Sequence, residues 1–297
     1  MVERTSFRLH LTRCSRIRRS SPSTEWGRVA GTPALTIGPL VRILLTNDDG
    51  VYAPGLEALR NELVKVGDVT VVAPTTEQSG VGHSITLLSP MVVQRVYDAE
   101  EEPLGWAVEG SPADCVKLAL LELLPEPPDL VVSGINSGPN AGINVLYSGT
   151  VAAAIEGAFF SLTSVAVSLD FVDHPEYQRA AALARGVVEQ VIERRPPTGC
   201  LFNLNLPALD RADPKGLRVV PMGIDRFGER FERRVDPRGR TYYWLTDAPR
   251  PRSLDGQTDV SSLADGYATL TPLHFDLTRS ELLGEVSGWN WEFTNNG

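Results

Sequence analysis

Short apolar runs alternate with polar, glycine-rich segments along most of this chain. The run Ile43–Thr46 has the length and composition of a buried strand. Leucines at helical spacing follow it from Leu56, and the helix that they predict is expected to end near Gly67, a residue type that suits the C′ position. The same reasoning predicts further strands at 69–73, 129–132, 164–169 and 201–206, and helices at 111–124, 151–160 and 176–195. Strands that alternate with helices in this way predict an α/β fold built on a parallel sheet.

The last third of the chain has a different pattern. A turn sequence, Asp-Pro-Arg-Gly at 236–239, predicts a hairpin, and a further strand is expected at 267–271. We interpret this part as a smaller β-rich segment used in subunit contacts. The expected domains are therefore an N-terminal extension (1–40), an α/β domain (41–215) and a C-terminal hairpin and oligomerisation region (216–297).

The first 40 residues are rich in Arg and Ser and lack apolar periodicity. They contain no hydrophobic core of a secretory signal, which leaves a disordered tail, a transit-type peptide or a translation artefact. We favour an artefact or an idle tail, because the first fold signal begins at Arg42. We hypothesise that the native protein starts at Val41, read as Met, which the intact mass of the endogenous protein tests.

Composition narrows the function. The net charge is −9, and because the first 40 residues carry +5, the remainder carries −14. So acidic a body is unsuited to nucleic-acid polymers, which require basic surfaces. The cysteines Cys14, Cys115 and Cys200 are few and far apart, which predicts a reducing, cytoplasmic location. No stretch approaches the length of a membrane span, so no membrane partner is expected.

Two adjacent carboxylates follow the first predicted strand. Asp48 and Asp49 lie in the turn 47–50, ahead of Pro54, which suits a first helical position. In an open α/β sheet this loop leaves the carboxyl end of a strand, where ligands bind. The turn alone is equally well explained by a capping carboxylate or by a nest for a hard cation.

Two later loops also leave predicted strands. Segment 74–86 contains Ser79, and segment 133–150 contains Asn136 and ends in Ser148-Gly149-Thr150. Backbone amides and hydroxyls at the start of the following helix form a ready phosphate site, although the lysine of a P-loop is missing. A merely tight glycine-rich turn would leave the Asn, Ser and Thr residues unexplained.

The three loops offer oxygen ligands that suit Mg²⁺, Mn²⁺ or Ca²⁺. Residues 43–58, 74–86 and 133–157 contain neither Lys nor Arg. If these loops bind an anion, a metal ion and backbone amides must supply the positive field. This favours metal-assisted chemistry on a phosphate ester.

Several ordered motifs resemble the SurE family of survival-protein 5′/3′-nucleotidases. They are Asn-Asp-Asp-Gly with Ala-Pro-Gly from 47, Ala-Pro at 73 followed by Gln-Ser-Gly, Gly-Ser-Pro-Ala-Asp-Cys-Val from 110, Val-Val-Ser-Gly-Ile-Asn-Ser-Gly-Pro-Asn from 131, and Tyr-Ser-Gly-Thr-Val-Ala-Ala-Ala from 147. The resemblance runs from Arg42 to about the end of the chain. It implies a Rossmann-like sheet with helices on both faces and a C-terminal segment for dimer or tetramer assembly.

The resemblance also implies site residues. One divalent ion, Mg²⁺ or Mn²⁺, would be bound by Asp48, Asp49, Ser79 and Asn136. The phosphate would contact Asn136, Ser148, Gly149 and Thr150. Departures at Ser111 and in the stretch 82–84 affect substrate-side details rather than the metal site.

We therefore predict a metal-dependent phosphomonoesterase that hydrolyses nucleoside 5′- and 3′-monophosphates, with short polyphosphate as a further candidate substrate. Asp48, Asp49 and Asn136 form the proposed catalytic set, and Asp48 is our choice as proton acceptor, although the sequence does not separate it from Asp49. An aspartyl-phosphate route through Asp48 is the second mechanism, disfavoured because Asp-x-Asp spacing is absent.

A non-catalytic nucleotide sensor is the alternative function, but the Gly-x-Gly-x-x-Gly of such folds is missing after the first strand. His83 is interpreted as a hydrogen-bonded structural residue rather than a catalyst. Ser111 and Asp114 are interpreted as a helix capping box rather than as catalytic groups.

Overall fold

The computed structural model describes residues 40–98, 100–210, 212–224, 230–246 and 257–291. The predicted N-terminal extension therefore lies outside the described residues, apart from Leu40. The strands are β1 (Val41–Thr46), β2 (Gly67–Pro74), β3 (Val93–Tyr97), β4 (Pro103–Val108), β5 (Leu130–Ser137), β6 (Thr163–Leu169), β7 (Leu201–Leu206), β8 (Leu217–Val219), β9 (Arg230–Val235), β10 (Thr241–Thr246) and β11 (Ala268–Leu273). The α-helices are α1 (Pro54–Leu63), α2 (Pro112–Leu118), α3 (Gly149–Phe159), α4 (Tyr177–Arg194), α5 (Asp259–Ala264) and α6 (Ser280–Ser287).

The central sheet has the strand order β3-β4-β2-β1-β5-β6-β7-β11-β8. The six strands from β4 to β7 are parallel, whereas β3 and β11 run antiparallel to their neighbours β4 and β7. Chain order reverses between β1 and β5, because β2 and β4 lie on one side of β1 and the later strands on the other. This confirms the predicted Rossmann-like α/β class.

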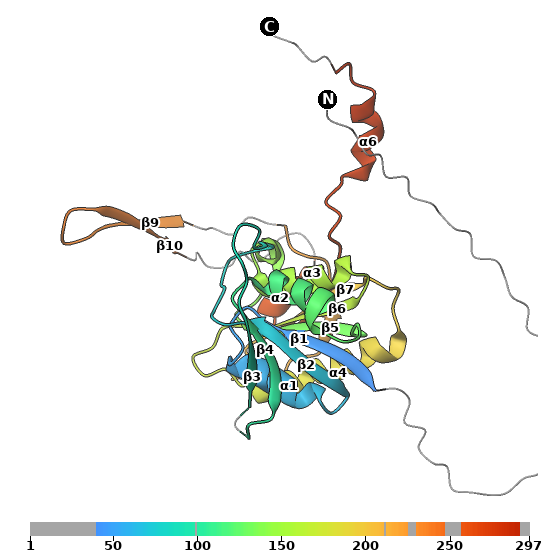
Figure 1. The fold of residues 1–297 in the computed structure, drawn as a ribbon. Coiled ribbons are helices and arrows are strands. Elements are labelled where there is room, and N and C mark those ends of the chain that lie inside the picture. Colours follow the sequence, from blue (N-terminus) through green and yellow to red (C-terminus); the bar gives the residue numbers. More distant parts are fainter. Residues whose placement is uncertain (1–39, 99, 211, 225–229, 247–256, 292–297) are drawn as a thin grey trace, which may run out of the picture. The chain divides into compact units, whose positions relative to one another are not determined.

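Helices cover both faces of the sheet (Figure 1). Side chains along β1 alternate between the two cores that these helices form with the sheet. Ile43 and Leu45 belong to the core formed with α1 and α4. Leu44 points the other way, into the core formed with α2 and α3. A central parallel strand that is buried on both faces needs a continuous apolar run, and Ile43–Leu45 provides it.

The start of α2 agrees with the capping interpretation. Ser111 Oγ accepts a hydrogen bond from Asp114 N, and Ser111 N donates to Asp114 Oδ2, at 3.1 and 2.9 Å. The Asp114 carboxylate also accepts from the backbone and hydroxyl of Thr86, so the cap fixes the end of the 74–86 loop. Burial raises the pKa of Asp114, but these hydrogen bonds outweigh it and the net pKa is lowered.

The C-terminal third has two kinds of structure. Strands β8 and β11 extend the central sheet beyond β7, whereas β9 and β10 pair only with each other among the described strands. The predicted turn at 236–239 closes this hairpin through bonds between Asp236 and Arg240. No helix among the described residues is long and apolar enough to cross a membrane.

The predicted end of the first helix was wrong. We expected Gly67 to follow the helix as its left-handed C′ residue, but α1 ends at Leu63 and Gly67 begins β2. Its lack of a side chain serves sheet packing instead, since a Cβ there would lie 2.3 Å from the carbonyl oxygen of Val41.

Two helical glycines give a matched test of this packing. A Cβ on Gly55 of α1 would lie 2.3 Å from the carbonyl oxygen of Ile135, whereas nothing lies within 4 Å of a Cβ on Gly186 of α4. We expect Gly55→Ala to lower the free energy of unfolding by about 1–3 kcal/mol through overpacking. Gly186→Ala should raise it by about 0.5–1 kcal/mol, because alanine favours the helix.

Urea melts of both variants beside the wild type measure these changes. A Gly55→Ala variant as stable as the wild type would mean that α1 does not pack this closely on β5.

Candidate active site

The acidic loop and the Asn-rich loop leave neighbouring strands. β1 and β5 pair in parallel, with Thr46 opposite Ser133, so the loops that follow them lie at the same sheet edge. This is the point where the strand order reverses, and open α/β sheets bind ligands in the crevice there. The fold therefore brings the first and third predicted loops together.

The turn after β1 is held by its own asparagine. Asn47 is fully buried, and its side chain donates to the carbonyl of Gly50 and accepts from the amide of Gly50, at 2.9 and 3.2 Å. Gly50 has a φ of +106°, a conformation that strains other residues. Asp48 and Asp49 are consequently presented from a closed turn rather than from a loose loop.

Asp48 lies against the start of α3. Its side chain is 5% exposed, and its Oδ1 accepts a hydrogen bond from the hydroxyl of Thr150. A Cβ on Gly149 would lie 2.9 Å from the Asp48 Cβ, so glycine is what permits the helix to approach. Burial raises the pKa of Asp48, and the bonds from Thr150 oppose this rise without cancelling it.

Asp49 points toward the third loop, where its Oδ2 accepts from the amide of Ser137 at 3.3 Å. Burial, the neighbouring Asp48 and the charge of Glu77 raise the pKa of Asp49 to about 6. In the described part of the chain neither Asp48 nor Asp49 forms an ion pair with a Lys or Arg. The two carboxylates are therefore partly desolvated, close together and uncompensated.

The second loop joins the other two through backbone bonds. The amide of Gln78 donates to the carbonyl of Asp48 at 2.7 Å, and the amide of Gly82 donates to the carbonyl of Tyr147 at 3.0 Å. Ser79 donates its hydroxyl to Glu77 at 2.6 Å. Glu77 thus adds a third carboxylate that the sequence analysis did not select, although it is the only acid in the 74–86 loop.

Asn136 lies on a strand rather than in the loop where the sequence placed it. β5 continues to Ser137, past an irregularity between Ser133 and Asn136, because it still pairs with β6 there. The Asn136 Nδ2 donates to the carbonyl of Gly138 at 2.7 Å, which fixes the amide and leaves Oδ1 as the acceptor.

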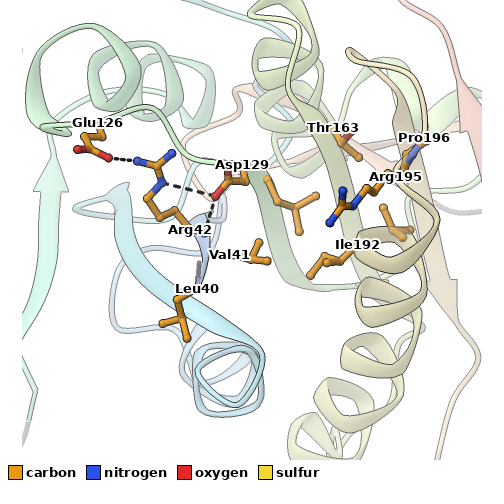
Figure 2. Close-up of a pocket in the computed structure, with 11 residues that line it drawn as sticks. Leu40, Val41, Arg42, Glu126, Asp129, Thr163, Ile192, Arg195 and Pro196 are labelled. Carbon is orange, nitrogen blue, oxygen red and sulfur yellow. Dashed lines mark hydrogen bonds and ion pairs between the residues drawn. The ribbon is translucent and has the colours of Figure 1, made fainter. Parts of the chain in front are cut away.

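Cavities mark where a ligand could enter. One of about 530 Å³ is lined by Asp49, Glu77, Ser79 and Ser137 together with apolar residues, so it brings the first two predicted ligand loops to one space; Asn136 does not line it. Another, of about 700 Å³, lies at the opposite edge, where β1 begins (Figure 2). There Arg42 pairs with Glu126 and Asp129, and none of the predicted site residues is present.

His83, in the 74–86 loop, has a structural partner on α3. The His83 Nε2 lies 2.8 Å from Oε2 of the buried Glu156, whose Oε1 pairs with Lys117 at 2.9 Å. Burial raises the pKa of Glu156, but these two partners outweigh it and lower it overall. This contact agrees with the interpretation of His83 as a hydrogen-bonded structural residue.

Asn140 is one of the asparagines that suggested ligand binding, but its hydrogen bonds are structural. Its amide donates to Asn205, its side chain donates to Ser168, and its carbonyl accepts from the side chains of Asn203 and Asn205. A buried carboxylate, Asp259, braces the same loop by accepting from the amide of Gly142 at 2.8 Å. The contacts of Asn140 and of Asp259 each join segments far apart in the chain, so local sequence patterns do not reveal them.

The site fits a hard divalent cation on its donor chemistry. Buried carboxylates are normally paired or bound to a metal, and this pair lacks a cationic partner among the described residues. Ser79 and Asn136, the other two expected ligands, would add neutral oxygens to a set without thiolate or imidazole. Within the described ranges no group of three or more His, Cys, Asp or Glu is arranged for a metal, so the two neutral ligands are essential to the assignment.

Comparisons with known proteins show which family the chain is similar to. Residues 43–229 match the family model for survival protein SurE. The chain is 56% identical over 251 residues to 5′-nucleotidase SurE of Rhodopirellula baltica, an alignment that covers 84% of this chain and 99% of the relative. It is 46% identical to 5′-nucleotidase SurE of Heliobacterium modesticaldum, in an alignment that covers 84% of this chain and 92% of that relative.

A solved structure is similar throughout the same region. The crystal structure of SurE protein from Aquifex aeolicus superposes with a TM-score of 0.73 at 36% sequence identity. It covers 83% of this chain and 98% of the other.

The raised pKa of Asp49 predicts how stability depends on pH in metal-free protein. The folded state holds this proton more tightly than the unfolded chain, where the pKa is near 3.8. This contribution to stability is present at about pH 4 and is lost as the pH rises through about 6. Asp49→Asn removes the titration, so it should melt like the wild type near pH 4 and at a higher temperature above pH 6.5.

Thermal melts in EDTA across this pH range measure the difference between the two proteins. A constant difference at every pH would contradict the assignment of the raised pKa to Asp49.

Proposed function

The chain belongs to the SurE family, and we propose that it hydrolyses nucleoside 5′- and 3′-monophosphates to nucleoside and inorganic phosphate. The observation that carries this function is the carboxylate pair of Asp48, buried beside the N-terminus of α3, and the half-buried Asp49, neither of which pairs with a Lys or Arg among the described residues. Such a site can bind a phosphate only if a cation neutralises the carboxylates first. The relatives' name, 5′-nucleotidase, supplies the substrate class.

SurE nucleotidases are generally metal-dependent, and the donor set supports one divalent ion, Mg²⁺ or Mn²⁺, in this chain. Asp48, Asp49, Ser79 and Asn136 would hold it. When bound, such an ion polarises phosphoryl oxygens and lowers the pKa of bound water. Ser79 would exchange its bond to Glu77 for the ion, whereas Asn136 is already oriented by Gly138.

The protein groups divide between proton transfer and phosphate binding. Asp48 accepts the proton of the attacking water at a carboxylate oxygen, and Thr150 keeps that carboxylate in place. Ser148 caps α3 because its Oγ accepts from the amide of Val151 at 3.0 Å. The amide of Gly149 and the hydrogen of the Ser148 hydroxyl bind phosphate oxygens at this helix start. Thr150 acts mainly through Asp48, because its hydroxyl is already used there. Trapping a phosphoenzyme would instead support Asp48 as nucleophile.

Assembly into a homodimer or homotetramer is part of the same proposal. The β9–β10 hairpin exposes Phe231, Trp244 and Leu245, and an isolated two-stranded hairpin is marginally stable in water. Helix α6 likewise has no buried residue. Contacts with further copies would cover these apolar side chains. A cytoplasmic location accords with the free thiols of Cys115 and Cys200.

Phosphate release from AMP tests the function. With Mn²⁺ present the wild type should release phosphate, and EDTA should abolish release because the carboxylates are then uncompensated. Asp49→Asn keeps the shape of the side chain but removes one charge, so metal affinity should fall about a hundredfold and activity should recover at high Mn²⁺. Near-zero release with and without metal would favour a nucleotide sensor.

Two variants separate metal binding from phosphate binding in the same assay. Asn136→Ala should lower kcat/KM at least about a hundredfold with little rescue by metal, because it is proposed to contact both ion and phosphate. Ser148→Ala should raise KM about tenfold, the effect of one hydrogen bond to a charged group. Wild-type activity of Asp49→Asn at low Mn²⁺ would show that the ligands are wrongly assigned.

A further inference from the structure

The cavity beside the carboxylates has an aromatic side that the hydrolysis itself does not use. Its lining includes the polar residues Asp49, Ser79 and Ser137 and the aromatic residues Phe171 and Tyr177. A nucleoside monophosphate has the same division, with a charged phosphate at one end and a flat base at the other. The cavity volume of about 530 Å³ lies within the range of small-molecule sites, roughly 300–1,000 Å³.

The two aromatic residues are held differently. Tyr177 begins α4 and is partly buried, with its ring against Gly55, where a Cβ would lie 3.2 Å from the Tyr177 Cε1. Phe171 lies between β6 and α4 and is 67% exposed, although phenylalanine is among the residues most often buried. Tyr177 therefore belongs to the wall, whereas Phe171 offers ring surface to a ligand.

Contact with Gly138, in the Asn-rich segment 133–150, fixes where Phe171 lies. A Cβ on Gly138 would lie 2.4 Å from the Phe171 Cζ, so the tip of the ring packs directly on the Gly138 backbone. The carbonyl of Gly138 holds the amide of Asn136 at 2.7 Å. The ring is thus placed beside the segment that carries a proposed ligand.

We propose that Phe171 is the surface on which the nucleobase of the substrate stacks. The inference rests on the proposed function, because it takes the phosphate to lie at the Asp49 end of this cavity. Every base has a π-face, so a phenylalanine platform favours nucleotides over phosphate esters without a base and is tolerant of which base is present. The ring would therefore select nucleotides as a class without selecting one base over another.

A second cavity provides the competing location for the base. It is about 610 Å³ in volume and contains Ser148, His83, Phe159 and Phe275, with His83 stacked on Phe159 at 5.2 Å between centroids. Phe159 lies eleven residues beyond Ser148 on α3, about 16 Å along the helix axis. The Phe171 cavity contains two proposed metal ligands, Asp49 and Ser79, which favours it.

The test compares AMP with ribose 5-phosphate, which is the same ester without the base. At saturating Mn²⁺, Phe171→Ala should lower kcat/KM for AMP about tenfold to a hundredfold, the effect of losing one base–aromatic stack. Its kcat/KM for ribose 5-phosphate should stay within about twofold of the wild type, because the phosphate groups are untouched. Phe171→Tyr keeps the ring and should retain AMP hydrolysis, and Phe159→Ala is the matched control.

The possible results are distinct. Equal losses on both substrates would overturn the inference by showing that Phe171 only supports the loop, and unchanged AMP hydrolysis in Phe171→Ala would also overturn it. A base-specific loss in Phe159→Ala alone would place the base in the second cavity. If the wild type hydrolyses neither substrate, the proposed function has failed and the inference fails with it.

Discussion

Two adjacent, partly desolvated carboxylates, with no cationic partner in the part of the chain that the structure describes, are the constraint on which this site depends. Burial raises the pKa of both Asp48 and Asp49, and the charge of Asp48 adds to the rise at Asp49. The three loops around them supply no Lys or Arg. A protein retains such a pair at a cost in stability, which is common at sites where charge is needed for function. Binding of the proposed divalent cation would remove this cost and create the positive field that a phosphate ester requires.

The fold supports that pair by docking a helix on it. Thr150 and Gly149 bring the N-terminus of α3 onto Asp48, while Ser137 from the end of β5 binds Asp49. Helix α3 therefore has two roles. The hydroxyl of Thr150 orients the Asp48 carboxylate, and the amide of Gly149 at the helix start is proposed to bind an anion. The braces at Asn140 and Asp259 keep the third loop in register with these contacts.

Much of this could be predicted from local patterns. The apolar run before Asp48 and the turn around Gly50 identify a strand end, and the same logic located the parallel sheet and α3. Other features depend on distant partners: Thr150 and Asp48 are 102 positions apart, and the strand character of Asn136 depends on pairing with β6. Glu77 was missed because its importance comes from the two charges it approaches, and Gly67 was misjudged because a neighbouring strand, not the preceding helix, requires it.

Calorimetric titration of the metal-free protein with Mn²⁺, in two buffers of different ionisation enthalpy, tests the central claim most directly. We expect about one ion to bind per chain. Proton release on binding should be substantial near pH 5.5 and small at pH 7.5, because the pKa of Asp49 is about 6. Asp49→Asn should bind more weakly and release fewer protons. Binding of equal affinity in that variant, or no proton release at pH 5.5, would contradict the claim that this carboxylate pair is the metal site.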